Sequence, residues 1–149
     1  MLTKTHIAIG IFAALILVEK VNFPIVFMAV TLIASVLPDI DSAFSSVGRK
    51  GIFRVVQLFT KHRGIFHSFT FCIIIAALLA FYWPVLAFPF FLGYGLHLLA
   101  DSFTIEGIRP FWPFKLESKG RVRVGGPLEH VLFAGFCIAD VALVFAFIL

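Results

Sequence analysis

The 149-residue chain is very apolar, with 61% hydrophobic residues, 13% charged residues and a mean hydropathy of +1.07. Soluble domains contain about 45–50% apolar and about 25% charged residues, so a soluble core of this size could not hide the surplus. The composition excludes an ordinary soluble protein and predicts a single membrane-embedded domain, residues 1–149. The net charge of +4 does not favour a nucleic-acid partner, because no recognition module accompanies the basic residues.

Five apolar segments predict an all-α integral membrane bundle of about five helices. They cover residues 5–18, 23–37, 68–83, 84–100 and 128–149. The breaks at Asn22-Phe23-Pro24 and Trp83-Pro84 each put a proline in the first turn of the next helix. The first four segments therefore form two helical hairpins, and the fifth forms a C-terminal helix.

Two connecting segments are unlike ordinary loops. In residues 42–61, apolar side chains recur at helical spacing among basic ones, which is typical of an amphipathic helix lying in the lipid headgroup region. Residues 102–127 contain PFWPF and five basic residues, too polar to span a membrane and too aromatic for an ordinary disordered linker.

The distribution of basic residues predicts the orientation. If all five segments cross the membrane, the N-terminus and both connecting segments share one face. Eleven of the twelve Lys and Arg residues fall there, and only Lys20 lies opposite. The positive-inside rule then predicts a multi-pass protein of the cell membrane with its N-terminus in the cytoplasm.

The ionisable residues gather at that same face, at the ends of the predicted helices. Imidazole nitrogens and carboxylate oxygens are the ligands of zinc and of harder divalent ions. His97 and Asp101 are four residues apart, so they lie on one face of a helix as a ligand pair. The candidate metal ligands are His6, Asp39, Asp41, His62, His67, His97, Asp101 and Glu129.

A repeat supports a shared centre. His6 and Asp39 are separated by 33 positions and His67 and Asp101 by 34, with a proline near the middle of each interval. Two hairpins that each begin with a histidine and end with an aspartate would bring two His/Asp pairs together. Coincidence in a single sequence is the alternative.

Each residue also has a structural interpretation. A lone histidine at a helix end is more often a cap than a ligand, and only the joint pattern favours His6, His67 and His97. His62 and His130 stay open. Asp39 and Asp41 could instead end one helix and cap the next segment, with only one of them ligating.

The motifs resemble a known family. Thr5-His6 with Gly10, LPDID, HRGIFHS, and GYGLHLLAD followed by a Thr and a Gly are similar to the YdjM family of membrane-bound metal-dependent hydrolases. The resemblance extends from Thr5 to about Glu129. That family is itself thought to be distantly related to zinc-dependent phospholipase C, a helical enzyme whose site holds several metal ions.

The resemblance implies specific ligands. His97 and Asp101 resemble the HxxxD pair of the phospholipases, and His67 would complete that first metal. His6 with Asp39 resembles the ligands of a second ion.

Two parts of the phospholipase pattern differ here. The phospholipases bind the second ion also through the N-terminal amine, but here Met1 lies several residues before His6, which leaves that contribution open. They also have an HxxxE pair that this chain lacks, and Glu129 is a partial replacement. The resemblance thus implies one to three divalent ions. Two ions are favoured, and zinc is the expected metal.

The predicted activity is metal-assisted hydrolysis of a phosphoester in a lipid or lipid-linked substrate. Asp39 or Glu129 would take a proton from water, and Arg63 would pair with phosphate oxygens. Alternatives are a divalent-ion transporter, or a membrane scaffold whose metal is structural. Membrane lipids are the expected partners, and the sequence sets no oligomeric state.

Overall fold

The computed structural model describes residues 1–41 and 64–148. Within these ranges it contains five α-helices and no strand: α1 (Thr3–Leu17), α2 (Pro24–Ala34), α4 (Phe69–Tyr82), α5 (Pro84–Ser102) and α6 (Pro127–Ile148). Three short 3₁₀ turns accompany them, η1 (Val18–Lys20), η2 (Leu37–Asp41) and η4 (Ile65–His67). The predicted all-α class is confirmed, while the predicted amphipathic helix in 42–61 lies outside the described residues.

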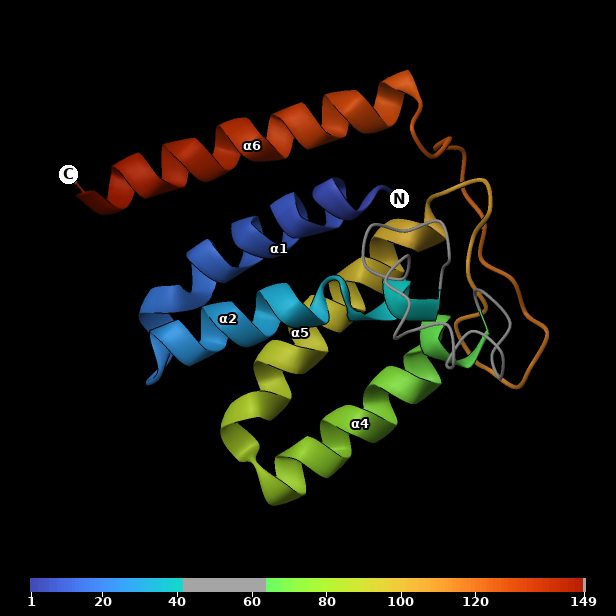
Figure 1. Cartoon of the computed structure of the whole chain (residues 1–149), viewed down its shortest axis with the longest axis horizontal. Coiled ribbons are helices and arrows are strands. Elements are labelled where there is room, and N and C mark those ends of the chain that lie inside the picture. The colour runs from blue at the N-terminus through green and yellow to red at the C-terminus, as the bar shows by residue number, and fades with distance from the viewer. Residues whose placement is uncertain (42–63, 149) are drawn as a thin grey trace.

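Two prolines define the hairpins. Pro24 and Pro84 are the first residues of α2 and α5, where their missing N–H costs no helical hydrogen bond. Figure 1 shows α1 and α2 running in opposite directions, as do α4 and α5, in agreement with the sequence prediction. Both hairpins consequently open toward the same end of the molecule.

Helix α5 is the central element of the bundle. It packs against α2 and α4 and also contacts α1, while α6 packs along α1 (Figure 1). The main apolar core forms where α2, α4 and α5 meet, and it includes Ala34, Cys72, Phe90, Tyr94, Leu98 and Ile108.

Helices α2 and α5 approach so closely that one glycine is required. A Cβ atom added at Gly93 would lie 2.1 Å from the carbonyl oxygen of Thr31 and 3.0 Å from the backbone nitrogen of Ser35. Small residues allow such close contacts between helices in membrane proteins. Gly93 therefore fixes the distance between α2 and the last two turns of α5, where His97 and Asp101 lie.

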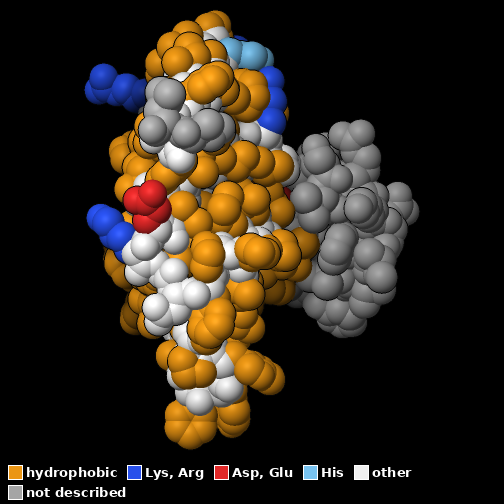
Figure 2. Space-filling view, turned by 90° about the vertical axis from the view of Figure 1, so that its left-hand side faces the viewer, with side chains coloured by type: hydrophobic (Ala, Val, Ile, Leu, Met, Phe, Trp, Pro, Cys, Tyr) orange, Lys and Arg blue, Asp and Glu red, His pale blue; other side chains and the backbone are white. Residues whose placement is uncertain are grey.

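Two helices are long and apolar enough to cross a membrane, α5 and α6. Helices α2 and α4 are apolar but shorter, with 11 and 14 residues. The apolar 18-residue window of α6 has no buried residue, so the surface of this part of the helix is free to face lipid. The end of the molecule that carries the α1–α2 and α4–α5 turns is covered largely by hydrophobic side chains (Figure 2).

Candidate metal centre

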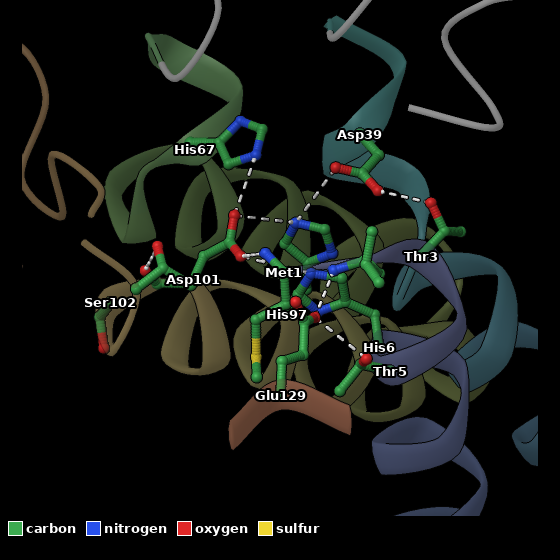
Figure 3. A network of polar contacts seen from close by, with 12 residues as sticks. Met1, Thr3, Thr5, His6, Asp39, His67, His97, Asp101, Ser102 and Glu129 are labelled. Carbon is green, nitrogen blue, oxygen red and sulfur yellow. Dashed lines mark hydrogen bonds and ion pairs between the residues drawn. The ribbon is translucent and has the colours of Figure 1, made fainter. Parts of the chain in front are cut away.

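Five ionisable side chains meet at the end of the bundle where the hairpins open (Figure 3). His6 lies near the start of α1, Asp39 in η2 and His67 at the end of η4, while His97 and Asp101 lie near the end of α5. All five are buried, with Asp39 the most exposed at 6%. The predicted convergence of these residues from four separate elements is therefore present in the structure.

The carboxylate of Asp101 lies at the middle of this group. Its Oδ1 atom is 3.3 Å from Nε2 of His6, and its Oδ2 atom is 3.7 Å from Nε2 of His67. Nε2 of His97 is 3.8 Å from Asp101 Oδ2 and 3.8 Å from Asp39 Oδ1. Ligand atoms of a tetrahedral zinc site with bonds of about 2.1 Å are about 3.4 Å apart. The spacing therefore fits a metal centre.

The ligand atoms form two overlapping groups. His6, His97 and Asp101 make one, and Asp39, His67 and His97 make the other, with the ligand atoms of each group within 4.8 Å of one another. His97 belongs to both. Either group alone has the composition of a zinc or manganese site.

The imidazole of His97 is oriented for ligation. Its Nδ1 atom is 2.8 Å from the carbonyl oxygen of Ser35, and because a carbonyl only accepts hydrogen bonds, Nδ1 must carry the proton. Its Nε2 atom then has an unshared electron pair directed at carboxylates that also only accept. Neither Nε2 of His97 nor Nδ1 of His6 has a hydrogen-bond partner among the described residues. A cation would satisfy this arrangement of acceptors.

The buried carboxyl group of Asp39 would also be stabilised in its ionised form by a nearby cation. Burial raises the pKa of its carboxyl group above the ordinary value, the histidines of the cluster lowering it in part. Its Oδ2 atom accepts a hydrogen bond of 3.2 Å from the hydroxyl group of Thr3. A bound cation would favour the ionised form.

Met1 also belongs to the cluster, a contribution that the sequence had left open. The backbone is extended at Leu2 and helix α1 begins at Thr3. This turns Met1 back toward α5, where its backbone nitrogen contacts Oδ1 of Asp101. The residue that looked too distant in sequence therefore lies beside the same carboxylate as His6.

Glu129 lies beside the cluster but contacts other groups. Its Oε1 atom accepts hydrogen bonds from the backbone N–H of Leu2 (2.5 Å) and from the hydroxyl of Thr5 (3.1 Å). Its Oε2 atom accepts one from the N–H of Gly125 (2.6 Å), whose φ of +72° favours glycine. Glu129 belongs to neither group of potential metal ligands. This geometry favours a positioning role over the predicted roles of ligand and base.

Two further contacts hold His67, and the sequence had not singled them out. The hydroxyl of Tyr94 donates a 2.5 Å hydrogen bond to the carbonyl oxygen of Phe66, the residue before His67. Ser68, the residue after it, caps α4 by accepting from the N–H of Phe71. The tyrosine of the GYGLH motif is a signal that could have identified the first contact.

The remaining candidates separate into two kinds. His62 and Arg63, and the side chain of Asp41, lie outside the described residues. His130 is exposed, and its Nδ1 atom is 2.8 Å from the carbonyl oxygen of Gly126, so it lies apart from the cluster.

Comparison with known proteins identifies the family. The chain is similar to the "Uncharacterized protein YvsG" of Bacillus subtilis (strain 168), with 28% identity over 144 residues that cover 92% of this chain and 90% of that protein. No solved structure matches the chain significantly. The family model described as "YdjM inner membrane protein" matches residues 1–148. The chain thus belongs to the YdjM family of inner membrane proteins.

Proposed function

We propose that this protein is a membrane-bound, metal-dependent hydrolase that cleaves a phosphoester of a lipid or lipid-linked substrate at the cytoplasmic face of the membrane. The observation that carries the proposal is the buried meeting of three imidazoles with the carboxylates of Asp39 and Asp101 at ligand spacing. Burying this many acceptor atoms without a cation would cost several kcal/mol. The resemblance to zinc-dependent phospholipase C provides the reaction class.

The arrangement of Asp101 favours two ions. Its Oδ1 atom is on the side of His6 and the Met1 nitrogen, and its Oδ2 atom is on the side of His67 and His97. Because Nδ1 of His97 is occupied by Ser35, this imidazole can bind one ion only. His67, His97 and Asp39 would hold one ion and His6 the other, and Asp101 could contribute to either. Zinc suits this ligand set best.

When bound, such ions supply Lewis-acid chemistry, which polarises a phosphoryl oxygen. The residues of the chain bind and orient the substrate and move the proton. Asp39 is the most exposed carboxylate of the cluster, so we assign it to accept the proton from water. Arg63 is assigned to the phosphate oxygens from the sequence, since an arginine can pair with them through two hydrogen bonds.

The proposed membrane placement extends the finding for α5 and α6 to all five helices. Crossing five times puts the cluster and eleven of the twelve basic residues on the cytoplasmic side. The shorter helices would require a locally thinned bilayer or a partly buried end. Introducing a cysteine at either end of α5 and measuring its reaction with a membrane-impermeant thiol reagent in intact cells would test this orientation.

The two alternatives make different demands on the structure. A divalent-ion transporter needs polar groups through the whole bilayer, whereas in the described helices the only acidic residue deep within an apolar segment is Asp140. A scaffold with a structural metal would be fully coordinated, whereas a catalytic site keeps an open position.

The test combines metal analysis with an assay of phosphodiester hydrolysis. Purified protein should contain divalent metal and hydrolyse a chromogenic phosphodiester or a phospholipid. The variants Asp101→Asn and His97→Ala should lose both, and His130→Ala, which removes an exposed imidazole, should lose neither. Metal that is retained without any hydrolysis of either substrate would favour the scaffold.

A further inference from the structure

The connection between α5 and α6 contains a closed hairpin. Ile108 and Ser118 exchange two backbone hydrogen bonds of 2.9 Å, and the N–H of Phe114 donates a 2.8 Å hydrogen bond to the carbonyl oxygen of Phe111. Residues 109–117, between the paired residues Ile108 and Ser118, form what we call the hairpin tip. The tip is therefore an ordered feature of the molecule.

The base of the hairpin is anchored in the bundle. Ile108 is 3% exposed and belongs to the main apolar core. The carbonyl oxygen of Pro110 accepts a 2.8 Å hydrogen bond from the N–H of Phe69 at the start of α4. These contacts hold the tip in a fixed position relative to the helices.

The tip exposes four large apolar side chains that pack against no core. Phe111, Trp112, Phe114 and Leu116 are exposed by 53%, 41%, 69% and 65%. Aromatic side chains of this kind are enriched where membrane meets water, since their rings suit the headgroup level. An anchored hairpin with an apolar tip is typical of a segment that inserts into lipid.

Positive charge surrounds the apolar tip. Glu117 is neutralised, because it pairs with Arg109 at 3.0 Å and with Lys119 at 2.6 Å. Lys115, Arg121 and Arg123 are exposed, and no acidic partner for them is found in the described parts of the chain. Residues 102–127 contain five basic and two acidic residues. The surface is therefore complementary to anions.

The position of the loop favours a membrane over other partners. It joins the C-terminal end of α5 to the N-terminal end of α6, the two helices long enough to span a bilayer (Figure 1). We propose that the hairpin tip inserts into the headgroup layer and that Lys115, Arg121 and Arg123 bind anionic lipid headgroups. The inference depends on α5 and α6 crossing the membrane and does not depend on the metal centre.

The two tryptophans of the chain permit a direct test. Trp83→Phe leaves Trp112 as the only tryptophan, and the full chain is reconstituted into phosphatidylcholine vesicles. Bromine-labelled phosphatidylcholine or bromine-labelled phosphatidylglycerol is then added at equal mole fraction to quench the emission of Trp112. Both lipids should quench, and the anionic lipid should bind near Trp112 about five-fold more strongly, the effect of one basic residue near anionic lipid.

Three controls complete the experiment. The triple variant Lys115→Gln/Arg121→Gln/Arg123→Gln should lose the anionic preference but keep quenching by phosphatidylcholine, which also reports that the tip still inserts. Trp112→Phe leaves Trp83, which joins α4 to α5. The α4–α5 turn lies at the opposite end of α5 from the α5–α6 connection (Figure 1), so this variant should show equal quenching by the two lipids. Removing metal with a chelator should leave the preference of Trp112 unchanged, which separates this inference from the proposed hydrolase function.

Two results would overturn the proposal. Quenching of Trp112 by iodide in water but by neither lipid would mean that the tip faces water or a protein partner. Equal quenching by both lipids would mean that the tip inserts without recognising anionic headgroups.

Discussion

Nδ1 of His97 on α5 lies 2.8 Å from the main-chain carbonyl oxygen of Ser35 at the end of α2. A helix contact thus orients the imidazole that both groups of potential ligands share. Gly93, four residues earlier on α5, lies against the same part of α2. The distance between the two helices and the orientation of the imidazole are consequently coupled.

Gly93→Ala should disturb both the distance between α2 and α5 and the orientation of the His97 imidazole. The added Cβ would lie 2.1 Å from the carbonyl oxygen of Thr31, a backbone atom that cannot move as a side chain can, so we expect a loss of about 1–3 kcal/mol of stability and a clear loss of bound metal. Thermal unfolding and metal analysis in detergent would measure both. Gly135→Ala on α6 is the matched control, since nothing lies within 4 Å of the added atom and the helix should tolerate it. Equal behaviour of the two variants would contradict the coupling.

Tyr94→Phe tests how His67 is positioned. The substitution removes the hydroxyl that donates to the carbonyl oxygen of Phe66, and we expect about 1 kcal/mol of lost stability. If this contact positions the ligand beside it, metal affinity should fall by about 10–100-fold with the number of ions unchanged. Titration of metal-free protein with zinc would measure affinity and stoichiometry together. A variant that binds zinc as tightly as the original chain would exclude the positioning role.

Much of this arrangement could be predicted from the sequence. Pro24 and Pro84 define the hairpins, and the four-residue interval between His97 and Asp101 places both on one helix face. Because successive helices run in opposite directions, the helix ends that carry His6, His67 and His97 lie at the same end of the bundle. These features depend on local chain geometry, which sequence patterns encode directly.

The contacts that complete the cluster could not be predicted in the same way. Ser35 contributes a main-chain carbonyl oxygen, which every residue has and no motif identifies. The nitrogen of Met1 meets a side chain 100 positions away, through an extended backbone at Leu2 that has no sequence signature. Glu129 was interpreted as a ligand because it is an acid at a predicted helix start that could partly replace the missing HxxxE pair, but its partners are the N–H groups of Leu2 and Gly125 and the hydroxyl of Thr5.

Glu129→Gln separates a positioning role from ligation. The amide nitrogen would face the N–H of Gly125 in place of an accepting oxygen, so we expect about 1–3 kcal/mol of lost stability. The protein should nevertheless bind the original number of ions. Glu106→Gln, at an exposed acid of the α5–α6 connection, is the control and should have little effect. Loss of one ion in Glu129→Gln alone would restore this residue as a ligand.

The raised pKa of Asp39 predicts how pH affects the metal-free protein. A carboxyl whose pKa is raised in the folded state binds its proton more tightly there, so the contribution of Asp39 to stability is present at low pH and is lost as pH rises through that raised value. Asp39→Asn removes this dependence, because its amide is never charged.

With a chelator present, Asp39→Asn should therefore gain stability relative to the original chain as pH increases above 3.8, the ordinary value for the carboxyl group. Added zinc should reverse the order at neutral pH, because the ionised carboxylate is then a ligand that the amide cannot replace. Thermal unfolding of both proteins across this pH range, with chelator and with zinc, measures the two differences. If the stability difference between the two proteins in chelator did not change with pH, Asp39 would keep an ordinary pKa in the folded protein. If Asp39→Asn stayed the more stable protein after zinc is added, Asp39 would not be a metal ligand.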